Sequence, residues 1–576
     1  MPRTRLSKRL LIALSLVALQ GGCGQETGPV LYRGGPVLTL DASNRIARAV
    51  AVEDDRIVAV GSEEELRDWI ETHDPRVVEL AGRALLPGFI DAHGHFPGGG
   101  ISAVFVDLNS PPIGDVEDIA SLVDLLAERA AETDTGEWVI GLGYDDSLLE
   151  EKRHPTRADL DRASSEHPIG VSHISGHLAV ANSAALELLG IDASTPDPEG
   201  GLIRRRFGGS EPDGVLEETA MDGFRKLALP GLADGLRVMK HAGERYLENG
   251  VTTAQSGLTD PTLVRVLDWA SWLGLVPVRL IVWPDLEAAD AIAEGELAAG
   301  GWDPLRLRVG AVKIVADGSI QGYTGYLSEP YHVPPGDDPS YRGYPRVARD
   351  DLIAQVGRLH RSGQQIAVHG NGDESIDDIL DAYESAQAEH PRSDARHIII
   401  HAQMARPDQL DRMAELGVVP SFFSLHTFYW GDRHRQIFMG PERAARMSPA
   451  ASARDRGVRF TIHADSPVVP MEPLRLVWAA VNRQTRSGFV VGPDERLPVM
   501  EALRAVTIDA AWQHFEEDLK GSIEPGKLAD LVILSASPLE SPGTIDEIRV
   551  EETIIGGRTV YQREARPSPR EEAADR

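Results

Sequence analysis

The sequence predicts an α/β fold built on a (β/α)8 TIM barrel, with a large insertion after strand one. A small β-sandwich domain is expected to form from both chain ends. Three observations predict this: short apolar segments recur between residues 85 and 462, helical periodicity fills most of the intervals, and β-rich segments occupy both ends. An open, doubly wound sheet is the alternative architecture.

The first segment of the chain is typical of an export signal. Basic residues precede an apolar run from Leu10 to Leu19, which is too short to span a bilayer. Small residues then lead to Cys23, as in a bacterial lipoprotein signal. We expect residues 1–22 to be a signal peptide and a lipidated Cys23 to anchor an exported, periplasmic or cell-surface protein. Gln20 is unusual in such a signal, so ordinary signal-peptidase cleavage and an uncleaved anchor are alternatives.

Short strands separated by polar turns fill residues 28–85, and a similar texture returns over residues 521–562. Because these two segments resemble one another and differ from the middle of the chain, we expect them to form one composite β-sandwich domain. The tail over residues 563–576 is charged and contains proline, and it is expected to be disordered.

Residues 86–520 alternate strand and helix patterns, which indicates a parallel sheet. The expected barrel strands are Leu85–Ala92, Gly250–Ala254, Val276–Trp283, Leu307–Ala316, Gln365–Val368, His397–Ile400, Val418–Phe423 and Arg459–Ile462. The interval between the first two strands is too long for a plain connection. We therefore expect residues 96–235 to form an inserted subdomain over the barrel mouth.

Composition excludes several classes of function. The chain has 58 basic and 89 acidic residues, and the net charge of −31 argues against nucleic acid as a partner. A single cysteine in 576 residues excludes a disulfide framework and a cysteine-based zinc or iron–sulfur site. A metal would therefore be bound by histidine, carboxylate or a rarer ligand. The sequence leaves the oligomeric state open.

Metal-ligating residue types recur in the expected strands, at or near the ends where barrel enzymes place their chemistry. These residues are His93, His95, Lys313, His369, His401 and Asp465. Strand alternation puts His93 and His95 on one face, close enough to share a metal. One such histidine alone is more often an ordinary polar residue, but their recurrence makes a coincidence improbable.

The motifs that contain these residues resemble the amidohydrolase superfamily. The similarity is strongest to the branch called amidohydrolase family 3, which includes N-substituted formamide deformylases and many uncharacterised metal-dependent hydrolases. It extends from about residue 29 to 561. The most specific motifs lie at residues 86–95, 312–319, 396–403 and 464–467.

The resemblance implies a site for one or two divalent ions, with zinc the expected metal. His93, His95 and Asp465 would hold one ion, and His369 and His401 the other.

The resemblance also implies that a carboxylated Lys313 bridges the two ions. A protonated lysine cannot ligate a metal, whereas a carbamate offers carboxylate-like oxygens. The alternative is a free ammonium paired with Asp317 or another acid, in which case the site would bind a single metal.

By this resemblance, the protein is expected to hydrolyse a C–N bond in an amide, formamide or N-acyl compound. A metal-activated water would attack a small-molecule substrate, and Asp465 would carry the proton. The same site acting on an ester, lactone or cyclic amide is an alternative. A lipoprotein that binds a ligand without turnover is another.

Three residues outside the metal ligands are candidate substrate contacts. His177 corresponds to a histidine that the family places near the substrate. Tyr323 lies in the segment after Ser319 where many relatives carry an arginine, and it would make the pocket more apolar than one with that arginine. His426 follows the seventh strand and would face the same pocket. Roles in packing alone are the alternatives.

Overall fold

The computed structural model describes residues 28–227 and 231–564. Cys23, the predicted signal peptide and most of the predicted tail lie outside the described residues. Within the described ranges, no helix combines the length and the apolar character needed to cross a membrane.

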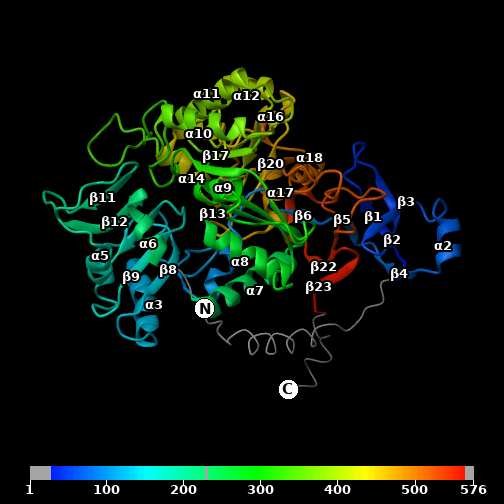
Figure 1. Cartoon of the computed structure of the whole chain (residues 1–576), viewed down its shortest axis with the longest axis horizontal. Helices are drawn as coiled ribbons and strands as arrows, with labels where there is room; N and C mark the ends of the chain where they lie inside the picture. Colours follow the sequence, from blue (N-terminus) through cyan, green and yellow to red (C-terminus); the bar gives the residue numbers. More distant parts are fainter. Residues whose placement is uncertain (1–27, 228–230, 565–576) are drawn as a thin grey trace, which may run out of the picture.

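Parallel strands form the centre of the molecule in two hydrogen-bonded sets (Figure 1). The first set is β6 (Phe89–Ile90), β13 (Val251–Thr259), β14 (Arg279–Pro284) and β15 (Leu307–Val309). The second set is β16 (Val312–Val315), β17 (Ile366–Gly370), β18 (Ile398–His401), β19 (Val419–Phe422) and β20 (Thr461–Ile462).

Neighbouring strands in both sets follow the chain order without the reversal that marks a doubly wound sheet. Strand β16 also contacts β13 and β14, so the two sets lie against each other. This arrangement is that of a TIM-barrel-like α/β domain.

Helices separate most of these strands, as the periodicity predicts. The main ones are α8 (Pro261–Trp272), α9 (Leu286–Ala293), α10 (Arg349–Arg361), α11 (Asp373–Glu389), α12 (Pro407–Leu416) and α17 (Pro473–Asn482). Helix α8 shows why such a helix begins where it does. The Asp260 side chain accepts hydrogen bonds from the backbone N–H groups of Thr262 and Leu263, and Pro261 occupies the first turn.

Two predicted barrel strands are each divided in the structure. The first is split at Gly88 into β5 (Ala84–Pro87), which joins another sheet, and β6, which joins the barrel. At Gly88 a Cβ would lie 2.2 Å from the Thr252 side chain, so only glycine permits this close approach. The fourth is interrupted between β15 and β16 at Gly310, whose backbone packs closely on the Trp283 ring.

Between β6 and β13 the chain forms a separate six-stranded sheet in the order β11-β12-β10-β9-β8-β7. Its strands are β7 (Val106–Asp107), β8 (Val139–Tyr144), β9 (Ile169–His173), β10 (Leu178–Ala181), β11 (Gly201–Arg205) and β12 (Pro212–Glu218). This sheet has an apolar core of its own, to which helix α3 (Ile119–Ala131) contributes. In Figure 1 it lies to one side of the barrel.

Strands from both ends of the chain pair in one eight-stranded sheet, in the order β23-β22-β21-β5-β1-β2-β3 with β4 beside β1. The N-terminal strands are β1 (Val30–Leu38), β2 (Ile46–Glu53), β3 (Arg56–Gly61), β4 (Arg76–Glu79) and β5. The C-terminal strands are β21 (Leu531–Leu534), β22 (Val550–Ile555) and β23 (Arg558–Gln562). All of them belong to a single hydrogen-bonded sheet.

A buried ion pair joins this eight-stranded sheet to the barrel. Asp530, just before β21, accepts hydrogen bonds from Arg279 Nε at 2.6 Å and Nη2 at 2.9 Å. We expect Asp530→Ala to lower the free energy of unfolding by about 3–5 kcal/mol, because it leaves a buried guanidinium unpaired. Thermal and urea unfolding measure the change.

Asp303→Ala is the matched control for this prediction. Its pair with Arg306 is exposed and 3.7 Å long, so its loss is expected to cost less than about 1 kcal/mol. Equal destabilisation by the two substitutions would show that the buried pair contributes no more stability than an exposed pair.

Candidate metal centre and substrate cavity

The predicted ligands converge at the carboxyl end of the barrel strands. Asp465 Oδ1 lies 3.2 Å from His93 Nε2 and 3.3 Å from His95 Nε2. The donor atoms of these three residues all lie within 4.8 Å of one another. Asp465 Oδ2 lies 3.8 Å from His401 Nε2, and the His401 and His369 ring centroids are 4.6 Å apart. One carboxylate therefore faces histidines from several strands.

The backbone at two of these residues adopts a conformation that side chains rarely allow. His401, the last residue of β18, has φ of 69°, and Asp465, just after β20, has φ of 54°. Such conformations cost about 1–3 kcal/mol each and persist where the surrounding structure enforces them, often at functional sites.

Each of the four histidines has its Nδ1 atom engaged by another group. His93 Nδ1–H donates to Gln255 Oε1 at 3.0 Å, and His95 Nδ1–H donates to the Gly257 carbonyl at 2.9 Å. Because these acceptors carry no proton to donate, each imidazole must hold its proton on Nδ1. The Nε2 lone pairs are thereby directed to the centre.

His369 follows the same rule, since its Nδ1–H donates to Asp317 Oδ1 at 3.1 Å. His401 Nδ1 is engaged by another imidazole and lies 3.1 Å from His463 Nε2. Burial and the nearby Lys313 lower the pKa of His93 to about 3, and burial is the main cause that lowers the pKa of His401 well below its ordinary value. Neutral imidazoles are the form that binds metals.

Lys313 lies in the middle of this group and is 2 % exposed. Its Nζ atom is 3.3 Å from His93 Nε2. Burial lowers the pKa of Lys313 to about 7, so its uncharged amine is accessible near neutral pH. Asp317 is not its partner. The Asp317 carboxylate accepts hydrogen bonds from His369 and from three backbone N–H groups, so the predicted alternative of a Lys313–Asp317 ion pair is wrong.

A cavity of about 590 Å³ adjoins the predicted ligands. One wall carries the metal-ligand candidates, and another comes from the six-stranded sheet and its flanking segments. Apolar residues on that second wall include Phe105, Ile140, Leu142, Met221 and Phe224. The cavity therefore places an apolar wall opposite the polar side chains of the metal-ligand candidates.

The structure places the three candidate substrate contacts differently. His177 lines the cavity, and its ring centroid is 5.0 Å from that of His369. Tyr323 is not among the cavity-lining residues, because its ring packs against Tyr331 and Phe438, with centroids 5.0 Å away in each case. His426 is buried behind His401, with ring centroids 6.0 Å apart, and it is also absent from the lining.

A second group of metal-type donors, Asp145, Asp146 and His173, lies in the six-stranded sheet region. Here other groups of the protein already form hydrogen bonds with the atoms that would bind a metal. Asp145 accepts hydrogen bonds from the Ser147 N–H and the Trp430 indole N–H, and His173 Nε2–H donates to Asp146 at 3.1 Å. This group connects the inserted sheet to the segment after β19.

Comparison with known proteins decides the family. The model of the amidohydrolase family matches residues 76–561. The chain belongs to the amidohydrolase family. It is 30% identical over 545 residues to an N-substituted formamide deformylase from Arthrobacter pascens, covering 92% of this chain and 97% of the relative. It is 29% identical to the putative amidohydrolase YtcJ of Bacillus subtilis, covering 92% and 99%.

Solved structures agree with this amidohydrolase assignment. An uncharacterized metal-dependent hydrolase from Pyrococcus furiosus is 26% identical, with a TM-score of 0.68 over 89% of this chain and 100% of the other. A second such hydrolase, from Pyrococcus horikoshii, shares the fold with a TM-score of 0.71 at 24% identity, covering 93% and 100%.

Amidohydrolases are metal-dependent, and the residues of this member fit a divalent ion. Asp465 Oδ1 is buried and makes no hydrogen bond within the described part of the chain, although it faces two imidazole nitrogens. A buried carboxylate oxygen that has no hydrogen-bond donor and is surrounded by neutral imidazoles is a favourable site for a cation. The Nδ1 partners supply the outer contacts that metal-binding histidines require.

Several residues of this amidohydrolase site escape prediction from the sequence. Gln255 lies within β13, and its Oε1 accepts from both His93 Nδ1 and the Gly94 N–H. The His463 ring lies between those of His401 and His93, with centroids 5.0 Å and 5.3 Å away, and its Nδ1 atom is 2.9 Å from Ser421 Oγ. The one available signal is that His463 and Asp465 lie two positions apart, directly after the last barrel strand.

Proposed function

We propose that this amidohydrolase hydrolyses a C–N bond in an amide, formamide or N-acyl compound, with a metal-activated water as the nucleophile. The observation that carries the proposal is the convergence of the Nε2 atoms of His93, His95 and His401 on the Asp465 carboxylate, with the Nδ1 atom of each ring engaged elsewhere. The formamide deformylase relative supports a C–N bond as the target.

His93, His95 and Asp465 would hold one ion, and His369 and His401 a second. A carboxylated Lys313 would bridge the two, and zinc is the proposed metal. When bound, such ions make hydroxide available at neutral pH and polarise the substrate carbonyl.

The residues of the chain carry the remaining tasks. Asp465, which faces the Nε2 atoms of His93 and His95, would accept the proton of the attacking water. It then passes this proton to the leaving nitrogen, so that amide and water become carboxylic acid and amine. The apolar wall that includes Phe105 and Phe224 holds the substituent of the substrate and excludes water.

A substrate panel tests this function. Zinc-reconstituted protein is incubated with N-formyl amines, N-acyl amines, cyclic amides, lactones and aryl esters, and release of amine or acid is followed. Turnover of N-formyl or N-acyl amines is the expected result. Hydrolysis of esters, lactones or cyclic amides alone would contradict the proposed substrate class and show that the enzyme cleaves one of those bonds instead. Binding without any turnover would favour a ligand-binding lipoprotein.

We further propose that the protein is exported. The basic start, the short apolar run and the lone Cys23 support removal of residues 1–22 and lipidation of Cys23 at the periplasmic or cell surface. A lipid-modified Cys23 at the mature N-terminus, found by mass spectrometry, would support this, and an unprocessed N-terminus would contradict it.

We also propose the division of the chain given by its sequence. Residues 28–85 with 521–562 would form a composite β-sandwich domain, residues 86–520 the hydrolase barrel, and residues 96–235 a subdomain inserted into it. The pairing of β5 with β21 and the separate six-stranded sheet support this division. Limited proteolysis tests it: cleavage is expected at the boundaries near residues 96 and 235, and cuts confined to other segments would contradict it.

A further inference from the structure

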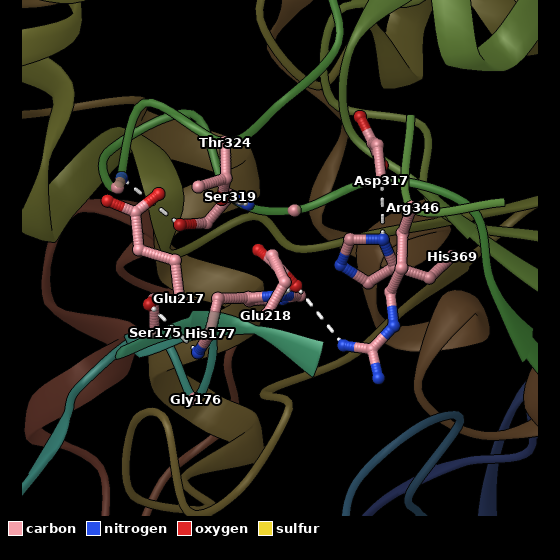
Figure 2. A network of polar contacts seen from close by, with 12 residues as sticks. Ser175, Gly176, His177, Glu217, Glu218, Asp317, Ser319, Thr324, Arg346 and His369 are labelled. Atoms are coloured by element: carbon pink, nitrogen blue, oxygen red, sulfur yellow. Dashed lines mark hydrogen bonds and ion pairs between the residues drawn. The ribbon is translucent and has the colours of Figure 1, made fainter. Parts of the chain in front are cut away.

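A buried carboxylate connects the cavity residue His177 to the barrel. Glu218 ends β12 and is 1 % exposed. Its Oε2 atom accepts hydrogen bonds from His177 Nδ1–H at 2.9 Å and from Arg346 Nη1 at 3.2 Å (Figure 2). The Glu218 backbone N–H also donates to the His177 carbonyl at 2.9 Å. Both the ring and the backbone of His177 are therefore held by one residue.

The backbone of Glu218 is strained, with φ of 50° and ψ of −118°. Such a conformation costs on the order of 1–3 kcal/mol and requires support from its surroundings. The Glu218 side chain packs against Gly318, in the segment after β16. A Cβ at Gly318 would lie 2.0 Å from Thr324 Oγ1 and 2.2 Å from Glu218 Oε1, so only glycine leaves room for both side chains.

The partners of Glu218 fix the direction of the hydrogen bond to His177. Burial raises the pKa of Glu218, but His177 and Arg346 together bring it below its ordinary value, so the carboxylate is ionised. An ionised carboxylate only accepts, so His177 Nδ1 must donate. His177 Nε2 makes no hydrogen bond to the described residues, and the ring lies at the cavity beside His369.

We propose that Glu218 is a positioning residue that fixes the His177 ring with Nε2 facing the substrate, while Arg346 holds the carboxylate in place. The kinetic part of this inference rests on the proposed hydrolase function. A ring with a fixed orientation presents Nε2 to a polar group of the substrate without a search over rotamers. Figure 2 shows that the contacts come from both the inserted sheet and the barrel, so Glu218 couples the two at the cavity.

A double-mutant cycle tests the proposal kinetically. We expect Glu218→Gln to lower kcat/KM roughly 10- to 100-fold, as loss of a residue that orients a site histidine does. In a His177→Ala background, the same substitution is expected to change kcat/KM by less than about twofold. Equal losses in both backgrounds would mean that Glu218 supports the fold alone, and would overturn the proposal.

Glu217→Gln is the matched control. Glu217 is the preceding residue and is 3 % exposed, but its partners are Arg204 and the Tyr344 hydroxyl. We expect it to leave kcat/KM within about twofold of wild type. A loss as large as that of Glu218→Gln would mean that any buried carboxylate of this strand matters equally, and would contradict a specific role.

A second measurement does not depend on turnover. In protein with ¹⁵N-labelled histidine, His177 is expected to give a hydrogen-bonded Nδ1–H resonance, assigned by its loss in His177→Ala. The resonance should keep its position in Glu217→Gln and move upfield in Glu218→Gln, because a neutral amide oxygen accepts a weaker hydrogen bond than a carboxylate does. If Glu218→Gln does not fold, Gly318→Ala, whose methyl group would displace both the Thr324 side chain and the Glu218 carboxylate, should have the same effect.

The two proposals can fail separately. An unchanged His177 resonance in folded Glu218→Gln or Gly318→Ala protein would overturn the positioning role. A substrate panel without turnover, combined with the expected change in the resonance, would instead count against the hydrolase function and leave the hydrogen bond established.

Discussion

Replacing Asp465 with asparagine is expected to lower kcat/KM by roughly 10²–10⁴-fold, the usual contribution of a positioned proton-transfer group. The amide keeps the size of the side chain, but it cannot accept the proton of the attacking water and is a poor metal ligand. Steady-state kinetics on the best substrate of the panel measure the effect, with bound metal determined on the same samples.

Asp268→Asn is the control for this experiment. Asp268 is also buried, lies on α8, and accepts a hydrogen bond from the Gly300 N–H. We expect its replacement to leave kcat/KM within about twofold of wild type. Full activity in Asp465→Asn protein would show that Asp465 is not the proton carrier.

Lys313→Gln is expected to reduce bound metal from two ions to one per chain and to lower kcat/KM at least about 100-fold, as losses at metal-site residues do. Glutamine has no amine to carboxylate, so the bridging ligand is lost. Metal analysis and intact-mass measurement of the native protein test this, since a carboxylated lysine adds the mass of carbon dioxide.

Lys520→Gln provides the comparison. Lys520 is 4 % exposed and pairs with Glu516 at 2.7 Å, so its loss should reduce stability without changing metal content. If Lys313→Gln retains the metal content of wild type, and native Lys313 carries no added mass, the proposed bridge does not exist.

The positions of the metal-ligand candidates could be predicted from the sequence because each follows or lies in one barrel strand. Parallel strands bring their carboxyl ends to one edge, so His93, His369 and His401 meet although they are far apart in the chain. Their orienting partners could not be predicted. Gln255 and Glu218 reach the site through pairings between distant segments, and no local spacing encodes them.

The fold shows the same limit. Apolar segments and helical periodicity indicate the barrel strands and helices, because those signals are local. The division of one predicted strand at Gly88 depends on a close approach to Thr252 from another strand, and the break at Gly310 depends on the Trp283 ring. Likewise, the rings of Tyr323 and His426 pack against Phe438 and His401, which only the tertiary structure brings close to them.

The central claim is that histidine, aspartate and lysine ligands at the barrel mouth bind divalent metal that the reaction requires. The most direct measurement follows metal content and amide turnover in one preparation, as purified, after chelation, and after zinc is restored. We predict that both are lost together on chelation and return together with one or two ions per chain. Full turnover by metal-free protein would contradict the account.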